Sequence, residues 1–385
     1  MVGKLGIENY VLFWYSKEVL FDNKIKKAIS MVNKLDEQLH NVVLDSKSSF
    51  EIKCKKVKYL VRLGADVNSL SSKGEPILSG VDDIKMLELL IGLGADVNNK
   101  SDYGRTALFN AKNAEVAQYL IDKGGDVNIK DTVGDNALSL AIFYNRNDVL
   151  DVLINNGGDY TILDSTKKTL LFKSIIIGAR GNFVERLIKA GVKLDVQDCF
   201  GNTALMYAIE NRNEEAVIKL VEGGADVNVI GGFGHSALTI AIREGNEKIA
   251  RYLVENGADV NSYKNIKKRN IRIYDVPLIE AIKYQMNDLA KYLVEKGADI
   301  NANTGDCNVI AFAVKEENEE MVDFLLESGC DLSFTDRDGR RLWELPTTKD
   351  ISENIILEYN MREFKKKTQR VIDKVGKVFK IFGGR

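Results

Sequence analysis

The chain has 385 residues, of which 45% are hydrophobic and 29% are charged. This balance is typical of a folded, water-soluble chain and excludes an intrinsically disordered one. The formal net charge of −2 excludes a general attraction to nucleic acid or anionic lipid, so any such attraction has to come from local clusters of charge.

An apolar run near the start of the chain, Tyr10–Tyr15, is too short to span a membrane. It also lacks the basic leader and the small-residue cleavage site of a signal peptide. We therefore expect no signal peptide or transmembrane segment. Residues 1–34 are predicted to form a helical cap that covers one end of the fold.

Cysteine and histidine are too few and too scattered for a metal site, because zinc needs closely spaced ligand pairs. The four cysteines form no CxxC pair. A chain of this length buries a core without disulfides, so we expect reduced thiols and a cytoplasmic, intracellular protein. The thiols lie at Cys54, Cys199, Cys307 and Cys330.

One five-residue motif recurs nine times along the chain. Its intact form, Gly-Ala-Asp-Val-Asn, begins at Gly64, Gly94, Gly224 and Gly257. Looser copies begin at Gly124, Gly157, Gly191, Gly297 and Gly329. The copies are about 33 residues apart, and a period of this size predicts stacked supersecondary units that bury their apolar faces against one another.

The unit Asp198–Asn228 shows the pattern within one copy. A polar turn precedes Thr203, a good helix N-cap, and apolar residues at helical spacing then predict two short helices. Gly223 and Gly224 are expected to end the second helix in the left-handed conformation. Val227 is expected to insert between layers, and the small alanines to keep the two helices close.

These units resemble the ankyrin repeat family from about residue 35 to residue 344. The cap-and-helix box of the family is matched by TALFNA, NALSLA, TALMYA and SALTIA, which begin at Thr106, Asn136, Thr203 and Ser236. Each box keeps a capping residue but has alanine in place of the usual first-turn proline. The resemblance implies an all-α fold with short β-hairpin fingers, an α-solenoid of about nine repeats over residues 35–345.

Three units depart from the pattern. The units Pro76–Asn98 and Thr106–Asn128 are three residues short, so their first helix is predicted to be clipped by a turn. The unit that begins at Asp164 has Lys167 where the finger glycine is expected. Its finger is predicted to be irregular, or Lys167 to adopt a strained positive φ.

The finger at 262–275 carries an insertion of about seven residues that is rich in positive charge. Insertions in repeat arrays often map to the binding face, which favours a basic finger for an acidic partner or phosphate groups. The alternative is a solvated, lysine-rich loop. The cations are Lys264, Lys267, Lys268, Arg269 and Arg272.

Two sets of positions are candidate partner-binding residues. The residues before the finger glycines are predicted to form a partly exposed apolar ladder; they are Tyr103, Val133, Phe200 and Phe233. The alternative is that they pack on the neighbouring finger. The second set lies at the exposed ends of the first helices and beside a finger; it comprises Phe143, Tyr144, Arg243, Tyr284 and His235.

Residues 346–364 are predicted to form a closing helix. Residues 365–385 contain eight Lys or Arg and one Asp, so the local charge is +7. Val371, Val375, Val378 and Phe382 recur at helical spacing, with Lys374, Lys377 and Lys380 on the other side. We favour a stripe that folds back over the last repeat, because the array needs its final apolar face covered. The alternative is a basic amphipathic helix that binds a membrane surface or a partner helix.

The sequence contains no phosphate-binding loop, HExxH pair or nucleophile elbow. We therefore predict a non-enzymatic scaffold without cofactor or small-molecule substrate. The resemblance implies binding of another protein through the concave surface of fingers and inner helices, as an adaptor or a masking inhibitor. The alternative function is a peripheral membrane or nucleic-acid tether that uses residues 264–272 and 365–385.

Overall fold

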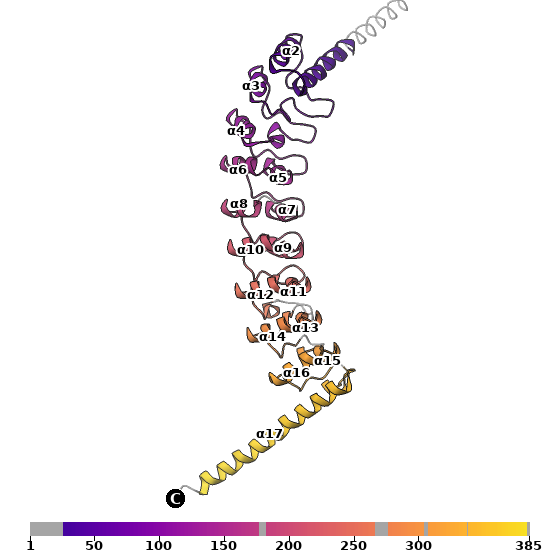
Figure 1. Ribbon diagram of the computed structural model, residues 1–385, viewed down its shortest axis with the longest axis vertical. Coiled ribbons are helices and arrows are strands. Elements are labelled where there is room, and N and C mark those ends of the chain that lie inside the picture. Colours follow the sequence, from indigo (N-terminus) through magenta and orange to yellow (C-terminus); the bar gives the residue numbers. More distant parts are fainter. Residues whose placement is uncertain (1–25, 177–181, 266–275, 304–306, 337, 383–385) are drawn as a thin grey trace, which may run out of the picture. The chain divides into compact units, whose positions relative to one another are not determined.

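The computed structural model describes residues 26–176, 182–265, 276–303, 307–336 and 338–382, with side chains left undescribed at 264–265 and 371–382. Residues 1–25 of the predicted helical cap, with the apolar run at 10–15, lie outside the described residues. The chain divides into two compact units, residues 1–192 and residues 193–385. In each unit, helices pair into hairpins that stack on one another (Figure 1).

The first described segment of unit 1, residues 26–44, is helical, so the expected domain boundary at residue 34 lies inside a helix. Outer helices alternate with shorter inner helices along the unit. The elements are α2 (Phe50–Arg62), α3 (Ile84–Gly92), η1 (Ala107–Asn110), α4 (Ala114–Asp122), α5 (Ala137–Phe143), α6 (Asn147–Asn155), α7 (Leu170–Ile176) and α8 (Phe183–Lys189).

Unit 2 continues the alternation and ends in one long helix. The elements are α9 (Ala204–Glu210), α10 (Glu214–Glu222), α11 (Ala237–Arg243), α12 (Glu247–Glu255), η2 (Ser262–Asn265), α13 (Pro277–Lys283), α14 (Asn287–Glu295), α15 (Val309–Lys315), α16 (Glu319–Glu327), η4 (Leu342–Glu344) and α17 (Lys349–Phe382).

The first glycine of each of the nine motifs follows an outer helix and adopts a positive φ of 80–101°. After α10, the Gly224 amide donates to the Val221 carbonyl oxygen and the Ala225 amide donates to that of Leu220, which closes the helix end. The predicted helix stop is confirmed for Gly224. The left-handed conformation predicted for Gly223 is wrong, because Gly223 remains right-handed at φ −75° and is still part of the last helical turn.

The last residue of the motif links one repeat to the next. The Asn228 side chain donates from Nδ2 to the Gly257 carbonyl oxygen (2.9 Å) and accepts at Oδ1 from the Asp259 amide (2.8 Å). Both partners belong to the following motif. Asn68, Asn98, Asn128 and Asn261 form the same pair of bonds. We call this series the asparagine ladder. It explains why the copies of the motif are so similar in sequence.

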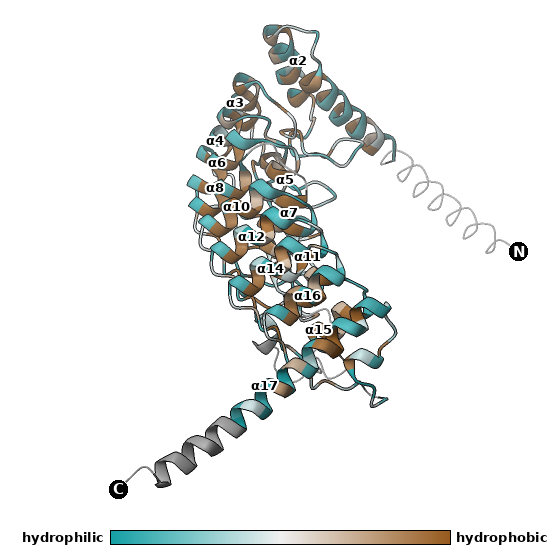
Figure 2. Ribbon diagram, turned by 60° about the horizontal axis from the view of Figure 1, so that its bottom comes forward, coloured by the Kyte–Doolittle hydropathy of each residue, from teal (hydrophilic) through white to brown (hydrophobic). Residues whose placement is uncertain are grey.

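Small and branched apolar side chains fill the layers between hairpins. Ala208, Ala241 and Ala281 are completely buried on three successive inner helices, as the close approach of paired helices requires. Val227 is buried, as its predicted place between layers requires. Figure 2 shows the paired helices with one hydrophobic and one hydrophilic side.

The fingers are tight turns, and the described residues contain isolated β-bridges in place of full hairpin strands. Six finger glycines adopt φ between 71° and 89°. The first helix of the second short unit is reduced to the 3₁₀ turn η1, which confirms the predicted clipping. There the Thr106 hydroxyl is buried and makes no capping bond, so this one expected cap is wrong. Asn136, Thr203 and Ser236 do cap their helices.

Lys167 occupies the finger-glycine position with φ 62°, which confirms the predicted positive φ. A non-glycine side chain pays strain in this region. Replacing Lys167 by glycine should therefore raise the free energy of unfolding by about 1 kcal/mol. Urea unfolding would measure the change. The control Lys130→Gly, at an exposed residue without positive φ, should lower stability, and a loss for Lys167→Gly as well would contradict the strain argument.

Candidate protein-binding surface

The predicted fingertip residues are exposed in both units. Tyr103 and Val133 in unit 1 are 60% and 68% exposed, and Phe200 and Phe233 in unit 2 are 55% and 62% exposed. Two of the four turns are held by a side-chain cap: Asp131 accepts from the Val133 amide (3.0 Å), and Asp198 does the same for Phe200. Val133 and Phe200 therefore project from fixed backbone turns.

Adjacent fingers are tied through their backbones. In unit 1 the Thr132 amide donates to the Tyr103 carbonyl oxygen (2.9 Å), which sets the two tips side by side. In unit 2 the fingers approach so closely that a Cβ on Gly232 would lie 2.1 Å from the Phe200 carbonyl oxygen. Glycine at this position allows the two fingers to pack against each other.

Unit 1 has a groove of about 410 Å³ between its fingers and inner helices, which we call the inner groove. Three exposed apolar side chains line it: Phe143, Tyr144 and Ile176. The rings of Phe143 and Tyr144 meet edge to face with centroids 5.1 Å apart, and the Arg146 guanidinium lies 4.7 Å from the Tyr144 ring centroid. The other lining residues are Arg105, Asp135, Ser139, Leu140, Asp164 and Lys173.

The charges in and beside the inner groove are paired within the protein. Arg105 bonds the buried carboxylate of Asp131 at 2.9 Å, and Lys173 pairs with Asp135. For Asp164, burial acts to raise the pKa, but hydrogen bonds from the Thr166 hydroxyl and from the Lys168 and Thr166 amides more than offset it and lower the pKa. The groove thus presents apolar surface with its charges already held in place.

Unit 2 presents a more polar surface on its inner side. Arg243 at the end of α11 donates to Nε2 of His235 on the adjacent finger (2.9 Å). At the end of α13, the Lys283 ammonium lies 5.0 Å from the Tyr284 ring centroid and 3.6 Å from the buried carboxylate of Glu280. The predicted residues His235 and Arg243 are therefore in contact.

Other predicted sites fall on undescribed positions. Lys264 lies in η2 but its side chain is not described, and Lys267, Lys268, Arg269 and Arg272 lie outside the described residues. Lys374, Lys377 and Lys380 lie on α17, where only the backbone is described.

Sequence reasoning identified two of the nine residues that line the inner groove and missed the other seven, among them Ile176, Arg105 and Lys173. Ile176 is the last residue of α7, as Phe143 is of α5, so the repeat alignment contained the signal that could have identified it. Arg105 and Lys173 could not be identified in this way, because their ion pairs reach 26 and 38 residues along the chain.

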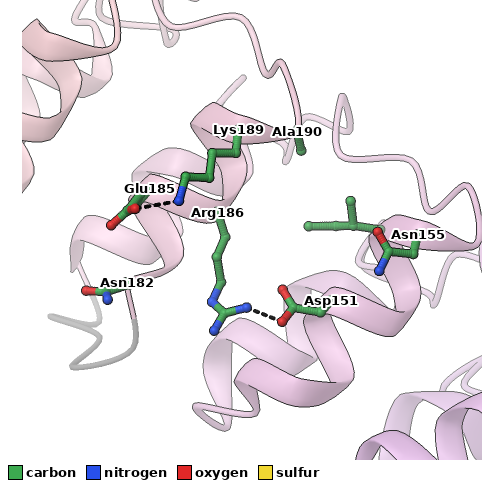
Figure 3. Close-up of a pocket in the computed structure, with 8 residues that line it drawn as sticks. Asp151, Asn155, Asn182, Glu185, Arg186, Lys189 and Ala190 are labelled. Carbon is green, nitrogen blue, oxygen red and sulfur yellow. Dashed lines mark hydrogen bonds and ion pairs between the residues drawn. The ribbon is translucent and has the colours of Figure 1, made fainter.

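A second hollow of about 450 Å³ lies in unit 1 between the outer helices α6 and α8 (Figure 3). Its lining is largely polar. Arg186 pairs with Asp151 across the two helices, and Lys189 bonds Glu185 along α8 at 2.7 Å. Asn155 and Asn182 complete the polar lining. Ile154 and Ala190 are the two apolar residues of the lining, and neither is aromatic.

Among the described residues, no cluster of three His, Cys, Asp or Glu is arranged to hold a metal ion. No helix in the same part of the chain is both long enough and apolar enough to cross a membrane. The four cysteines, all within the described residues, form no disulfide, and burial raises the pKa of Cys330 to about 11.

Stacked helical hairpins with exposed fingers define a repeat-built scaffold for binding other molecules. The ankyrin repeat family model matches residues 77–164, 171–264 and 265–336, more than half of the chain. The chain therefore belongs to the ankyrin repeat family, as its motifs predicted. Ankyrin repeats are protein–protein interaction domains, and the family is generally a non-enzymatic binding scaffold.

A solved structure shows the same fold. The ankyrin repeat domain of Bcl-3, described as a unique member of the IkappaB protein family, is 22% identical with a TM-score of 0.51, covering 58% of this chain and 98% of that one. The human ASB11 ankyrin repeat domain is 20% identical with a TM-score of 0.45, again covering 58% and 98%. No curated protein matches the chain.

Proposed function

We propose that the protein binds a partner protein through the inner groove of unit 1 and its neighbouring fingertips, as an adaptor or as an inhibitor that masks its partner's surface. The observation that carries this proposal is the set of three exposed apolar side chains that line the inner groove, Phe143, Tyr144 and Ile176. The exposed fingertip residues Tyr103 and Val133, on two fingers joined by a backbone hydrogen bond, add to it.

Exposed apolar side chains grouped in this way are typical of an interface, whereas scattered ones are not. Aromatic residues supply much of the binding energy at protein interfaces when they become desolvated. The ion pairs of Arg105 and Lys173 are satisfied before binding, so a partner would not have to desolvate a free charge here. The backbone-tied fingers also lower the entropic cost of binding.

The unit 2 fingertips, with Phe200 and Phe233, offer a second contact surface of similar chemistry. An adaptor would use the two units for different partners, whereas a masking inhibitor would use both for one. Separate variants in each unit distinguish these two roles.

The first test replaces Phe143 and Tyr144 together by alanine. Because these rings are exposed and contribute little to the core, the variant should fold with an unchanged melting temperature. It should lose at least tenfold in affinity for the partner, since interface aromatics contribute about 2 kcal/mol or more each. The measurement is quantitative affinity capture from the native source, with the captured proteins then titrated against purified wild type and variant.

The matched control is Asn155→Ala with Lys189→Ala in the polar outer hollow, which should leave binding unchanged. The double variant Phe200→Ala with Phe233→Ala tests unit 2 in the same assay. Equal retention of every partner by the Phe143 and Tyr144 variant would refute the role of the inner groove.

A further inference from the structure

Helix α17 has one face that docks on the last repeat. Ile351 and Ile355 are buried, and the Tyr359 ring packs on Trp343 with centroids 4.9 Å apart. Arg362 donates to the carbonyl oxygens of Cys330 (2.5 Å) and Leu326 (2.6 Å) at the end of α16. These contacts cover the final apolar face of the repeats.

A second apolar face lies on the opposite side of the same helix. Leu357, Met361 and Phe364 are 61%, 44% and 70% exposed and follow each other at intervals of four and three residues. With 100° of rotation per residue, this stripe points away from the side that docks. Over this part of the helix the capping face is therefore the one with Ile351 and Ile355, whereas the side chains of the stripe expected at 371–382 are not described.

The sequence continues the same spacing to the end of α17. After Thr368, the positions Val371, Val375, Val378 and Phe382 follow at alternating intervals of three and four. Figure 1 shows this part of the helix extending beyond the repeats of unit 2. It is one continuous helix from Lys349, so the expected boundary between residues 364 and 365 falls inside it.

Positive charge accompanies the stripe. Lys365, Lys366, Lys367 and Arg370 are exposed, and residues 365–385 carry eight basic residues against the single acid Asp373. Two copies pairing along this helix would each bring a local charge of +7 and repel each other. A coiled-coil seam also needs only two apolar residues in seven, whereas seven of the twelve residues 371–382 are apolar.

We propose that α17 is a membrane-surface helix, whose exposed apolar face, described at Leu357, Met361 and Phe364, lies in the interface of an anionic lipid bilayer. A broad apolar face with lysines on the remaining surface suits this position, because the lysine stems lie along the apolar boundary while their ammonium groups reach lipid phosphates. The docked face holds the helix at the last repeat, so membrane binding by α17 would anchor the repeats at the membrane.

The test uses the full chain and sedimentation with large vesicles of phosphatidylcholine, alone or with 30% phosphatidylserine. We expect binding to the anionic vesicles only, weakened by raising the salt concentration. Lys365→Glu with Lys367→Glu should reduce vesicle binding at least tenfold, since each cation near an anionic surface contributes to binding. Met361→Glu with Phe364→Glu should also reduce vesicle binding at least tenfold, because it places charge in the apolar stripe.

The matched control carries the same charge change on α2, Lys55→Glu with Lys58→Glu, at exposed residues, and should bind as wild type does. Absence of binding to anionic vesicles at low salt would overturn the proposal. So would concentration-dependent self-association that the Met361 and Phe364 variant abolishes, which would assign the stripe to a second copy. Binding to nucleic acid but not to vesicles would equally overturn it.

Discussion

Asn228→Ala is expected to lower the free energy of unfolding of unit 2 by about 1–3 kcal/mol. The substitution removes both bonds to the following repeat, to the Gly257 carbonyl oxygen and from the Asp259 amide. Each such bond contributes about 0.5–1.5 kcal/mol, and a carbonyl and an amide lose their protein partner at once. Urea unfolding followed by circular dichroism would measure the loss.

Asn256→Ala is the matched control. Its side chain donates only to the Tyr252 carbonyl oxygen within its own helix (2.8 Å), so its loss should be well below that of Asn228→Ala. Asn228→Asp keeps the acceptor for the Asp259 amide but loses the donor, and should fall between the two. Asp195 already accepts from the Asp226 amide in this way (2.9 Å). Equal losses for Asn228→Ala and Asn256→Ala would show that the ladder does not couple the repeats.

Gly232→Ala should destabilise unit 2 by about 1–3 kcal/mol and displace the Phe200 fingertip. The added Cβ would lie 2.1 Å from the Phe200 carbonyl oxygen and 2.9 Å from its carbon. Both are backbone atoms, so the whole finger has to move. The measurements are urea unfolding and the amide chemical shifts of the finger around Phe200.

Gly92→Ala is the control of opposite sign. Gly92 ends α3, has no positive φ, and an added Cβ would meet nothing within 4 Å. Alanine there should stabilise the protein by up to about 1 kcal/mol, because it reduces the entropy of the unfolded chain. Destabilisation by both substitutions would indicate that steric contact between fingers is not the cause at Gly232.

The spacing of the motif was enough to predict the stacked helical hairpins. Glycine after each outer helix and capping residues before most inner helices are local signals, because both act within one turn of helix. The exposed ends of inner helices, such as Phe143 and Tyr144, also followed from the repeat alignment. The helix cap predicted at Thr106 was wrong, because the shortened unit forms a 3₁₀ turn in which the Thr106 hydroxyl does not reach a capping amide.

The asparagine ladder was not predicted, although its residues were the most visible feature of the sequence. Its bonds join residues 26–38 positions apart, and periodicity along one chain does not show which backbone groups meet across a layer. The same holds for the ion pair of Lys173 with Asp135, which helps to shape the inner groove.

The sequence by itself determined the family, the repeat period and most of the places where the helices of the repeats start and stop, since these depend on contacts within a few residues. Only the tertiary structure decided which side of α17 docks on the repeats and which side, with Leu357 and Phe364, is exposed. Both sides are apolar in sequence, and the choice between them depends on what the end of α16 and Trp343 offer to Arg362 and Tyr359.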